Sequence, residues 1–145
     1  MARELTEAAR CAKEIRKELK QNFPGIKFKV VSDNFAGGDS VNVSWIDGPT
    51  SDRVDLITKK YQYGHFDGMQ DMYEYSNSRD DIPQAKYVQT NREMSDETRA
   101  KIIAEHNAEW CQEAQIRNES DYNEHMRQWN YSVVWRKFQE TDLET

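Results

Sequence analysis

The run from Gly37 to Thr50 constrains the fold of this chain more than any other stretch. It starts with a glycine pair, carries apolar residues at every second position from Val41 to Trp45, and ends in Asp47-Gly48-Pro49-Thr50. Glycines tolerate positive φ angles, alternation is typical of a strand with one buried face, and a threonine after a turn is typical of a helix N-cap. The run therefore predicts a strand that enters from a glycine turn and leads directly into a helix.

An amphipathic helix and a first strand precede this run. Thr6 is placed to cap a helix whose apolar stripe is Ala8, Ala9, Cys11, Ala12, Ile15 and Leu19, and Phe23-Pro24-Gly25 ends it. Apolar residues and lysines then alternate over 26–30, so we expect two strands that share one buried face and pair as a hairpin. The connection between them, Ser32 to Asp39, is longer than a tight turn.

The rest of the chain predicts further helices around one more strand. A second helix from Thr50 has Val54, Ile57 and Tyr61 inside and stops at Gly64, residues 65–83 form a long loop, and a strand covers 86–93. Ser95 caps a helix to about Ile116, and Ser120 begins a final helix. The fold class is α+β: about three strands in an antiparallel or mixed sheet with helices on one face, plus a C-terminal helical hairpin.

The length of 145 residues favours one domain. We expect an α+β core module over 1–94 and a helical pair over 95–145 that packs on it and unfolds with it. The last helix carries an aromatic stripe, and this stripe either packs on the core or forms the seam of a homodimer. Cys11 and Cys111 fall on apolar positions of the expected helices, which favours reduced packing thiols.

Charge and hydropathy limit the binding partners and the cellular location that we expect for the protein. Its net charge is −6, and the second half, from residue 67, is strongly acidic. An acidic surface repels a phosphate backbone, so nucleic acid is expected only at the N-terminal half. No stretch is apolar enough for a membrane helix and no signal-peptide core follows Met1, so we expect a cytosolic protein without membrane contact.

Several segments in the same order resemble a domain family of phages and conjugative elements, the large polyvalent protein associated domains, with family twenty-nine the nearest. The resemblance spans about residues 8–94 and is carried by 12–20, Phe23-Pro24-Gly25, Phe28 with Val30, 37–45, 47–50, 60–62, 66–69, Asp71, 73–75 and 86–88. It implies a small α+β module that occurs alone or within multidomain proteins of mobile elements. The resemblance implies no reaction. It therefore supports an expectation about the fold of this chain but none about catalytic chemistry.

The segment from Phe66 to Tyr75 is the main candidate for a binding surface. Exposed tyrosines bury much area at little entropic cost when they bind, and acidic residues accompany them here. The interaction residues that we predict are Phe66, Asp67, Asp71, Tyr73, Tyr75, Asp80 and Asp81. The alternative is that these aromatic residues only cover the edge of the sheet.

Two other sets of side chains are weaker candidates. His65, Asp67 and Asp71 are close enough in sequence to offer nitrogen and oxygen ligands to a metal, although Asp67-Gly68 is equally a turn signal. A basic face for nucleic acid would consist of Lys13, Arg16, Lys17, Lys20, Lys27 and Lys29. No nucleophile motif, metal motif or phosphate loop is present, so we expect neither catalysis nor a cofactor.

These features together predict a non-enzymatic interaction protein of a bacteriophage or other mobile element. It would work in the bacterial cytosol on a host or element-encoded protein, such as a host-defence protein. The alternatives are a nucleic-acid-binding accessory that uses the basic N-terminal face, and a metal-assisted enzyme acting on nucleic acid at 65–71.

Overall fold

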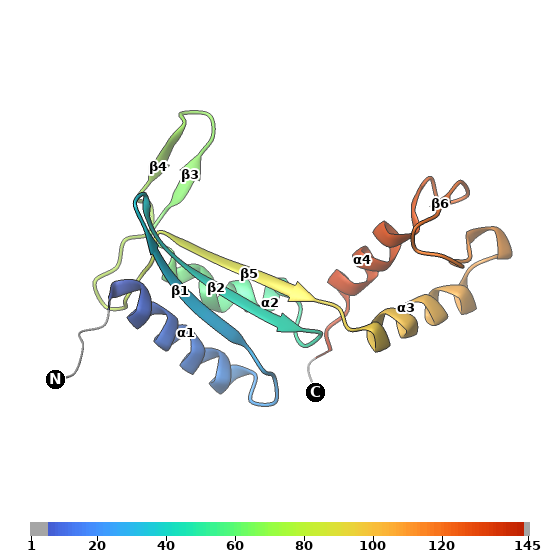
Figure 1. Ribbon diagram of the computed structural model, residues 1–145, viewed down its shortest axis with the longest axis horizontal. Helices are drawn as coiled ribbons and strands as arrows, with labels where there is room; N and C mark the ends of the chain where they lie inside the picture. The colour runs from blue at the N-terminus through green and yellow to red at the C-terminus, as the bar shows by residue number, and fades with distance from the viewer. Residues whose placement is uncertain (1–5, 144–145) are drawn as a thin grey trace.

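The computed structural model describes residues 6–143. In chain order they form α1 (Glu7–Asn22), β1 (Lys29–Phe35), β2 (Gly38–Ile46), α2 (Ser51–Thr58), the 3₁₀ helix η1 (Lys59–Tyr61), β3 (His65–Asp67), β4 (Met72–Glu74), β5 (Tyr87–Glu93), α3 (Asp96–Glu109), the 3₁₀ helix η2 (Gln112–Ala114), β6 (Tyr122–Asn123), β7 (Gln128–Trp129) and α4 (Asn130–Glu140). Figure 1 shows α1 to β5 around one sheet and α3 to α4 beyond the end of β5.

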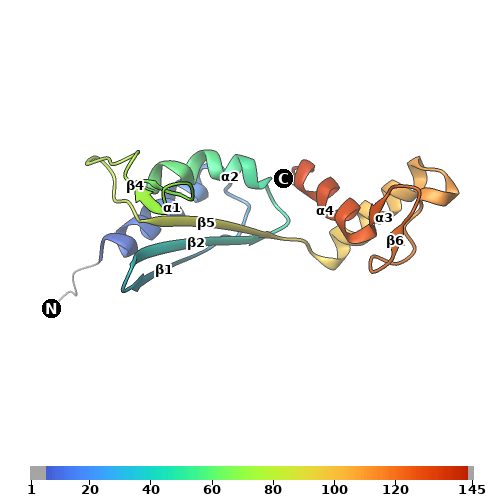
Figure 2. The same ribbon diagram turned by 90° about the horizontal axis from the view of Figure 1, so that it is seen from above.

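A mixed sheet of three strands, in the order β1-β2-β5, organises the first part of the molecule. β1 and β2 pair as an antiparallel hairpin, and β5 runs parallel to β2 after a connection that contains α2. Figure 2 shows α1 and α2 on the same face of this sheet. Asn42 and Gln89, which pair between β2 and β5, are exposed on the other face. The predicted α+β fold with helices on one face is confirmed.

The stripe of the first helix packs on the apolar side of the hairpin. Thr6 Oγ1 accepts a hydrogen bond from the Ala9 amide at 3.2 Å and caps α1. The buried core of this part comprises Cys11, Ala12, Ile15, Leu19, Phe23, Val30, Val41, Val43, Trp45, Val54, Tyr61 and Ala85. Burying one large side chain of this kind contributes about 1.5–3 kcal/mol, so this face of the hairpin fixes its register.

The hairpin turn differs from the prediction. β1 continues to Phe35, which pairs with Gly38, so only Ala36 and Gly37 turn the chain and residues 32–39 are not a long connection. The end of β1 is largely exposed and lacks alternation, so no strand pattern is present in the sequence there. Gly38 is required, since its φ is 146° and an added Cβ would lie 2.7 Å from Lys86 Cδ.

Two expectations for residues 50–83 are wrong. Thr50 caps α2 as predicted, but the helix ends at Thr58 and continues as η1, so Gly64 does not stop it. Residues 65–83 are not one long loop, because β3 and β4 form a short antiparallel hairpin. Three-residue strands are too short to show a period of two in the sequence.

The C-terminal part also differs in its boundaries. α3 ends at Glu109 rather than near Ile116, and the segment from Ser120 forms the β6–β7 hairpin before α4 begins at Asn130. α3 and α4 contact each other, and a second core consists of Met94, Ile102, Ile116, Val133, Val134 and Phe138. Cys11 is buried as expected, whereas Cys111 lies outside any helix and is exposed.

Arg92 and Asp47 join this second part to the sheet. The Arg92 guanidinium donates to the carbonyl oxygens of Asp47 (2.7 Å), Gly48 (2.8 Å), Phe138 (2.8 Å) and Thr141 (2.8 Å). The Asp47 carboxylate accepts from the amide and the hydroxyl of Ser95, the N-cap of α3. The turn at 47–50 therefore starts α2, orients α3 and holds the chain after α4.

No helix within residues 6–143 is both long and apolar enough to cross a lipid bilayer.

Candidate functional site

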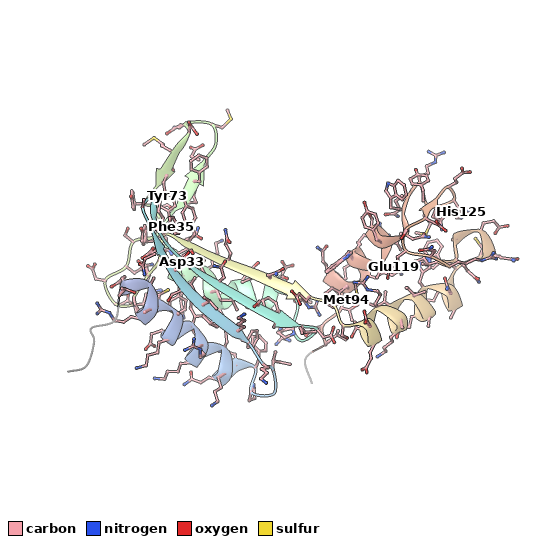
Figure 3. The ribbon with its side chains drawn as sticks, in the orientation of Figure 1. Asp33, Phe35, Tyr73, Met94, Glu119 and His125 are labelled. Atoms are coloured by element: carbon pink, nitrogen blue, oxygen red, sulfur yellow. The ribbon has the colours of Figure 1, made fainter. Side chains whose placement is uncertain are left out.

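Five aromatic rings from separate segments meet at one end of the sheet. They belong to Phe35, Tyr63, Tyr73, Tyr75 and Tyr87, and Figure 3 labels Phe35 and Tyr73 at the base of the β3–β4 hairpin. Tyr73 touches Tyr75 at 5.1 Å and Tyr87 at 5.7 Å between ring centroids, and Tyr63 stacks on Tyr75 at 5.5 Å. We call these five residues the aromatic cluster. Edge and stacked contacts of this kind hold rings in fixed positions.

Lys86 and Gly64 fix the aromatic cluster against the sheet. Lys86 Nζ lies 5.1 Å from the centre of the Tyr73 ring and donates to the Gly37 carbonyl, while its own carbonyl accepts from the Tyr73 hydroxyl at 2.6 Å. Gly64 lets the chain pass close to β4, because an added Cβ would stand 2.0 Å from the Glu74 carbonyl oxygen. Burial raises the pKa of Tyr73 to about 12, and burial also raises that of Tyr63, so both phenols stay neutral at physiological pH.

The β3–β4 hairpin carries apolar side chains into solvent. Phe66 is 54%, Met69 96% and Tyr75 66% exposed. Phe66 pairs with Tyr73 across the hairpin, so both lie on one face, while the His65–Glu74 pair lies on the other. The hairpin therefore presents an aromatic face backed by the rigid cluster below it.

The predicted interaction residues fall into two places. Phe66, Asp67, Asp71, Tyr73 and Tyr75 belong to the hairpin and its flank. Asp80 and Asp81 lie elsewhere, beside Glu7 and Arg10 near the start of α1, and Asp81 pairs with Arg79. Within the hairpin, Asp71 is exposed, whereas Asp67 and Glu74 are partly buried, so aromatic and acidic groups share this surface.

The metal candidates are engaged in other contacts. His65 Nδ1 lies 2.9 Å from Ser76 Oγ, and its Nε2 lies 3.5 Å from a Glu74 carboxylate oxygen. Asp67 accepts from the Met69 amide at 2.9 Å in the turn, and Asp71 occupies the left-handed region at φ 52°. In the part of the chain that the structure describes, no three His, Cys, Asp or Glu side chains are placed to hold a metal ion.

The basic candidates lie mainly along the exposed side of α1. Lys13, Lys17 and Lys20 are exposed and form no ion pair with any residue between 6 and 143. Arg16 instead reaches the outer edge of β1, where it donates to the Val30 carbonyl at 2.9 Å. Lys27 and Lys29 are exposed at the other end of the helix–strand connection. A basic strip exists, but no aromatic ring of the described chain stacks within it.

Sequence reasoning missed three of the five residues of the aromatic cluster, which are Phe35, Tyr63 and Tyr87. The segments that contain Tyr63, Tyr87 and Lys86 are far apart in the sequence. The parallel pairing of β5 with β2 is what brings β5 beside the β3–β4 hairpin. It also missed an exposed group on the C-terminal part, where Trp129 contacts Tyr122 and Tyr131. The spacing of these aromatic residues fits a helix stripe, so nothing in the sequence signalled the β6–β7 hairpin.

Comparisons with known proteins identify one family. The sequence profile described as large polyvalent protein associated domain 29 matches residues 6–95, which are α1 to β5 and the N-cap of α3. No curated protein and no solved structure matches the chain. The profile covers more than half of the sequence, and it contains the aromatic cluster and the turn at 47–50. The protein therefore belongs to the large polyvalent protein associated domain 29 family, which associates it with phages and other mobile genetic elements.

Proposed function

We propose that this protein is a non-enzymatic interaction module of a phage or mobile element, and that the aromatic face of the β3–β4 hairpin binds another protein in the host cytosol. The observation that carries the proposal is the exposure of Tyr75, whose ring belongs to the packed aromatic cluster, together with that of Phe66 on the same hairpin. Rings that are already ordered lose little entropy on binding, which is the usual property of interface hot spots.

Charge favours a basic partner. The hairpin segment from His65 to Tyr75 contains Asp67, Asp71 and Glu74 and no lysine or arginine, and the whole chain has a net charge of −6. Attraction between an acidic module and a basic surface raises the association rate and selects the partner. A host defence or DNA-processing protein with a nucleic-acid channel offers such a surface, and occupying that channel would block it.

Affinity capture from host lysate tests this proposal when it is combined with matched variants. Phe66→Ser and Tyr75→Ala should each weaken binding of the captured protein at least about tenfold, the loss of one hot-spot side chain. Ile46→Ser is the control, because Ile46 is 60% exposed at the end of β2 that lies away from the hairpin. A partner whose affinity, measured by calorimetry with purified protein, is unchanged in both hairpin variants contradicts the proposal.

The basic strip on α1 supports a second candidate function, a nucleic-acid-binding accessory. Lys13, Lys17 and Lys20 are exposed cations without a carboxylate partner among residues 6–143. Binding to duplex DNA should then weaken steeply with added salt and disappear in the Lys13→Glu, Lys17→Glu double variant. Lys101→Glu on α3 is the control. Fluorescence anisotropy that shows no binding at low salt, or binding that ignores salt, would remove this candidate.

A further inference from the structure

In the described part of the chain, the second half of β5 has a neighbouring strand on one side only. β5 is the last strand in the order β1-β2-β5. At its start the edge is covered, because Tyr63 donates to the Ala85 carbonyl at 3.2 Å and Gln62 Oε1 accepts from the Val88 amide at 2.8 Å. Beyond Val88, no strand formed by residues 6–143 pairs with β5 on this side.

The direction of the backbone groups along β5 follows from two hydrogen bonds. The Val88 amide points outward to Gln62, and the Glu93 carbonyl points inward, where it accepts from the Asp47 amide at 2.7 Å. Backbone groups of successive strand residues point to opposite sides, so Val88, Thr90 and Arg92 point outward and Gln89, Asn91 and Glu93 inward. The amide and carbonyl of Thr90 therefore face away from β2, together with the Val88 carbonyl.

A groove of about 880 Å³ runs along this edge. α2 forms one wall with Asp55, Leu56 and Lys59, and Val88 and Thr90 of β5 line the opposite side. Leu56 is 81% exposed at the groove, and Lys59 is exposed without an ion pair inside residues 6–143. Asp55 already accepts from the Thr90 hydroxyl at 2.7 Å, which turns the Thr90 side chain toward α2, and Thr90 itself lines the groove.

The shape of the molecule selects the kind of occupant. In Figure 1 the β3–β4 hairpin rises at one end of β5 and the α3–α4 part rises at the other, both on the open-edge side. A second folded copy that paired β5 with β5 would carry the same two projections toward this one and collide with them. A single extended segment needs only the width of one strand, about 4.8 Å from β5.

We propose that an extended segment of another protein adds to β5 as a fourth strand, with its backbone paired to Thr90. In this arrangement the segment donates an amide to the Thr90 carbonyl and accepts from the Thr90 amide. An aliphatic side chain of the segment covers Leu56, and an acidic one meets Lys59. This binding site is separate from the hairpin surface proposed above and goes beyond it, since Phe66 and Tyr75 take no part.

The first test measures amide hydrogen exchange and chemical shifts by NMR. In the free protein the Thr90 amide should exchange faster than those of Gln89 and Asn91, which bond to β2. The probe is a capped hexapeptide that carries valine and glutamate two residues apart, with threonine at the other positions, so that both side chains point to the α2 side of the groove. It is titrated to millimolar concentration. It should shift and protect the Thr90 amide, while the same peptide with lysine in place of glutamate should bind at least about threefold more weakly beside Lys59.

Two matched controls isolate the backbone pairing. Thr90→Pro removes the outward amide and should weaken the valine–glutamate peptide at least about tenfold, whereas Thr90→Val keeps the amide and should bind normally. The same peptide with N-methyl groups on the amides of one edge should not bind the unaltered protein, which avoids any folding effect of proline. Slow exchange of the Thr90 amide in the free protein, no shift with either peptide, or equal binding of the N-methylated peptide overturns the proposal. Tyr75→Ala should leave this binding intact, which separates it from the hairpin surface.

Discussion

Arg92 shows how much of this fold depends on one buried side chain. Its guanidinium serves four carbonyl oxygens and lies 3.8 Å from the centre of the Phe138 ring. Arg92→Met should lower the free energy of unfolding by about 2–4 kcal/mol, because buried carbonyls then lose their donors. Urea denaturation measures this, with Arg136→Met on the exposed side of α4 as the control. Equal stability of the two variants would contradict the assigned role.

Gly64 offers a second test at a single residue. An alanine methyl there would meet the Glu74 carbonyl oxygen at 2.0 Å, so β4 has to move away from position 64, between η1 and β3, and disturb the aromatic cluster. Gly64→Ala should cost about 1–3 kcal/mol of stability and weaken the near-ultraviolet circular dichroism of the tyrosines. Gly68→Ala in the hairpin turn is the matched control, since nothing lies within 4 Å of its added Cβ. A similar loss in both variants would show that the close approach does not matter.

The start of α3 depends on an ionised Asp47. Partial burial acts to raise the pKa of Asp47, but hydrogen bonds from Ser95 and Thr98 and the nearby Arg92 outweigh it, and the pKa lies below its ordinary value of 3.8. A carboxyl whose pKa is lower in the folded state stabilises the fold above its unfolded pKa and loses this effect as pH falls through the folded pKa. Asp47→Asn should therefore flatten the loss of thermal stability between about pH 5 and pH 2. An identical pH profile for the variant would contradict this.

Elements with a clear period could be predicted, and short ones could not. α1 and β2 carry uninterrupted stripes, so the sequence indicates both their type and the face that is buried. β3, β4, β6 and β7 have two or three residues each, which is too few to alternate, and tertiary contacts decide their conformation. The candidate site follows the same rule: Phe66, Tyr73 and Tyr75 lie in one segment and were predicted together, whereas Phe35 and Tyr87 join them only through sheet topology.

The whole molecule contains two apolar cores joined by the turn at 47–50. We expect them to unfold together, because Arg92 and the Leu143 amide, which donates to the Gly48 carbonyl at 2.8 Å, connect them directly. Val43→Ala in the first core and Val133→Ala in the second should each lower stability by about 2 kcal/mol. Hydrogen exchange followed by mass spectrometry should show faster exchange in both α1 and α4 for either variant. Exchange confined to the altered core would mean two independent units.

The position of Arg92 matters for any protein in which this domain is followed by different sequence. Arg92 and Asp47 fall inside the family match, but Phe138 and Thr141, which supply two of the four oxygens, fall after it. A chain that replaces residues 96–143 keeps the Arg92 guanidinium but loses two of its four carbonyl acceptors. The sequence that replaces these residues must again place backbone carbonyls next to Arg92. Arg92 therefore limits which sequences can follow the domain on its C-terminal side.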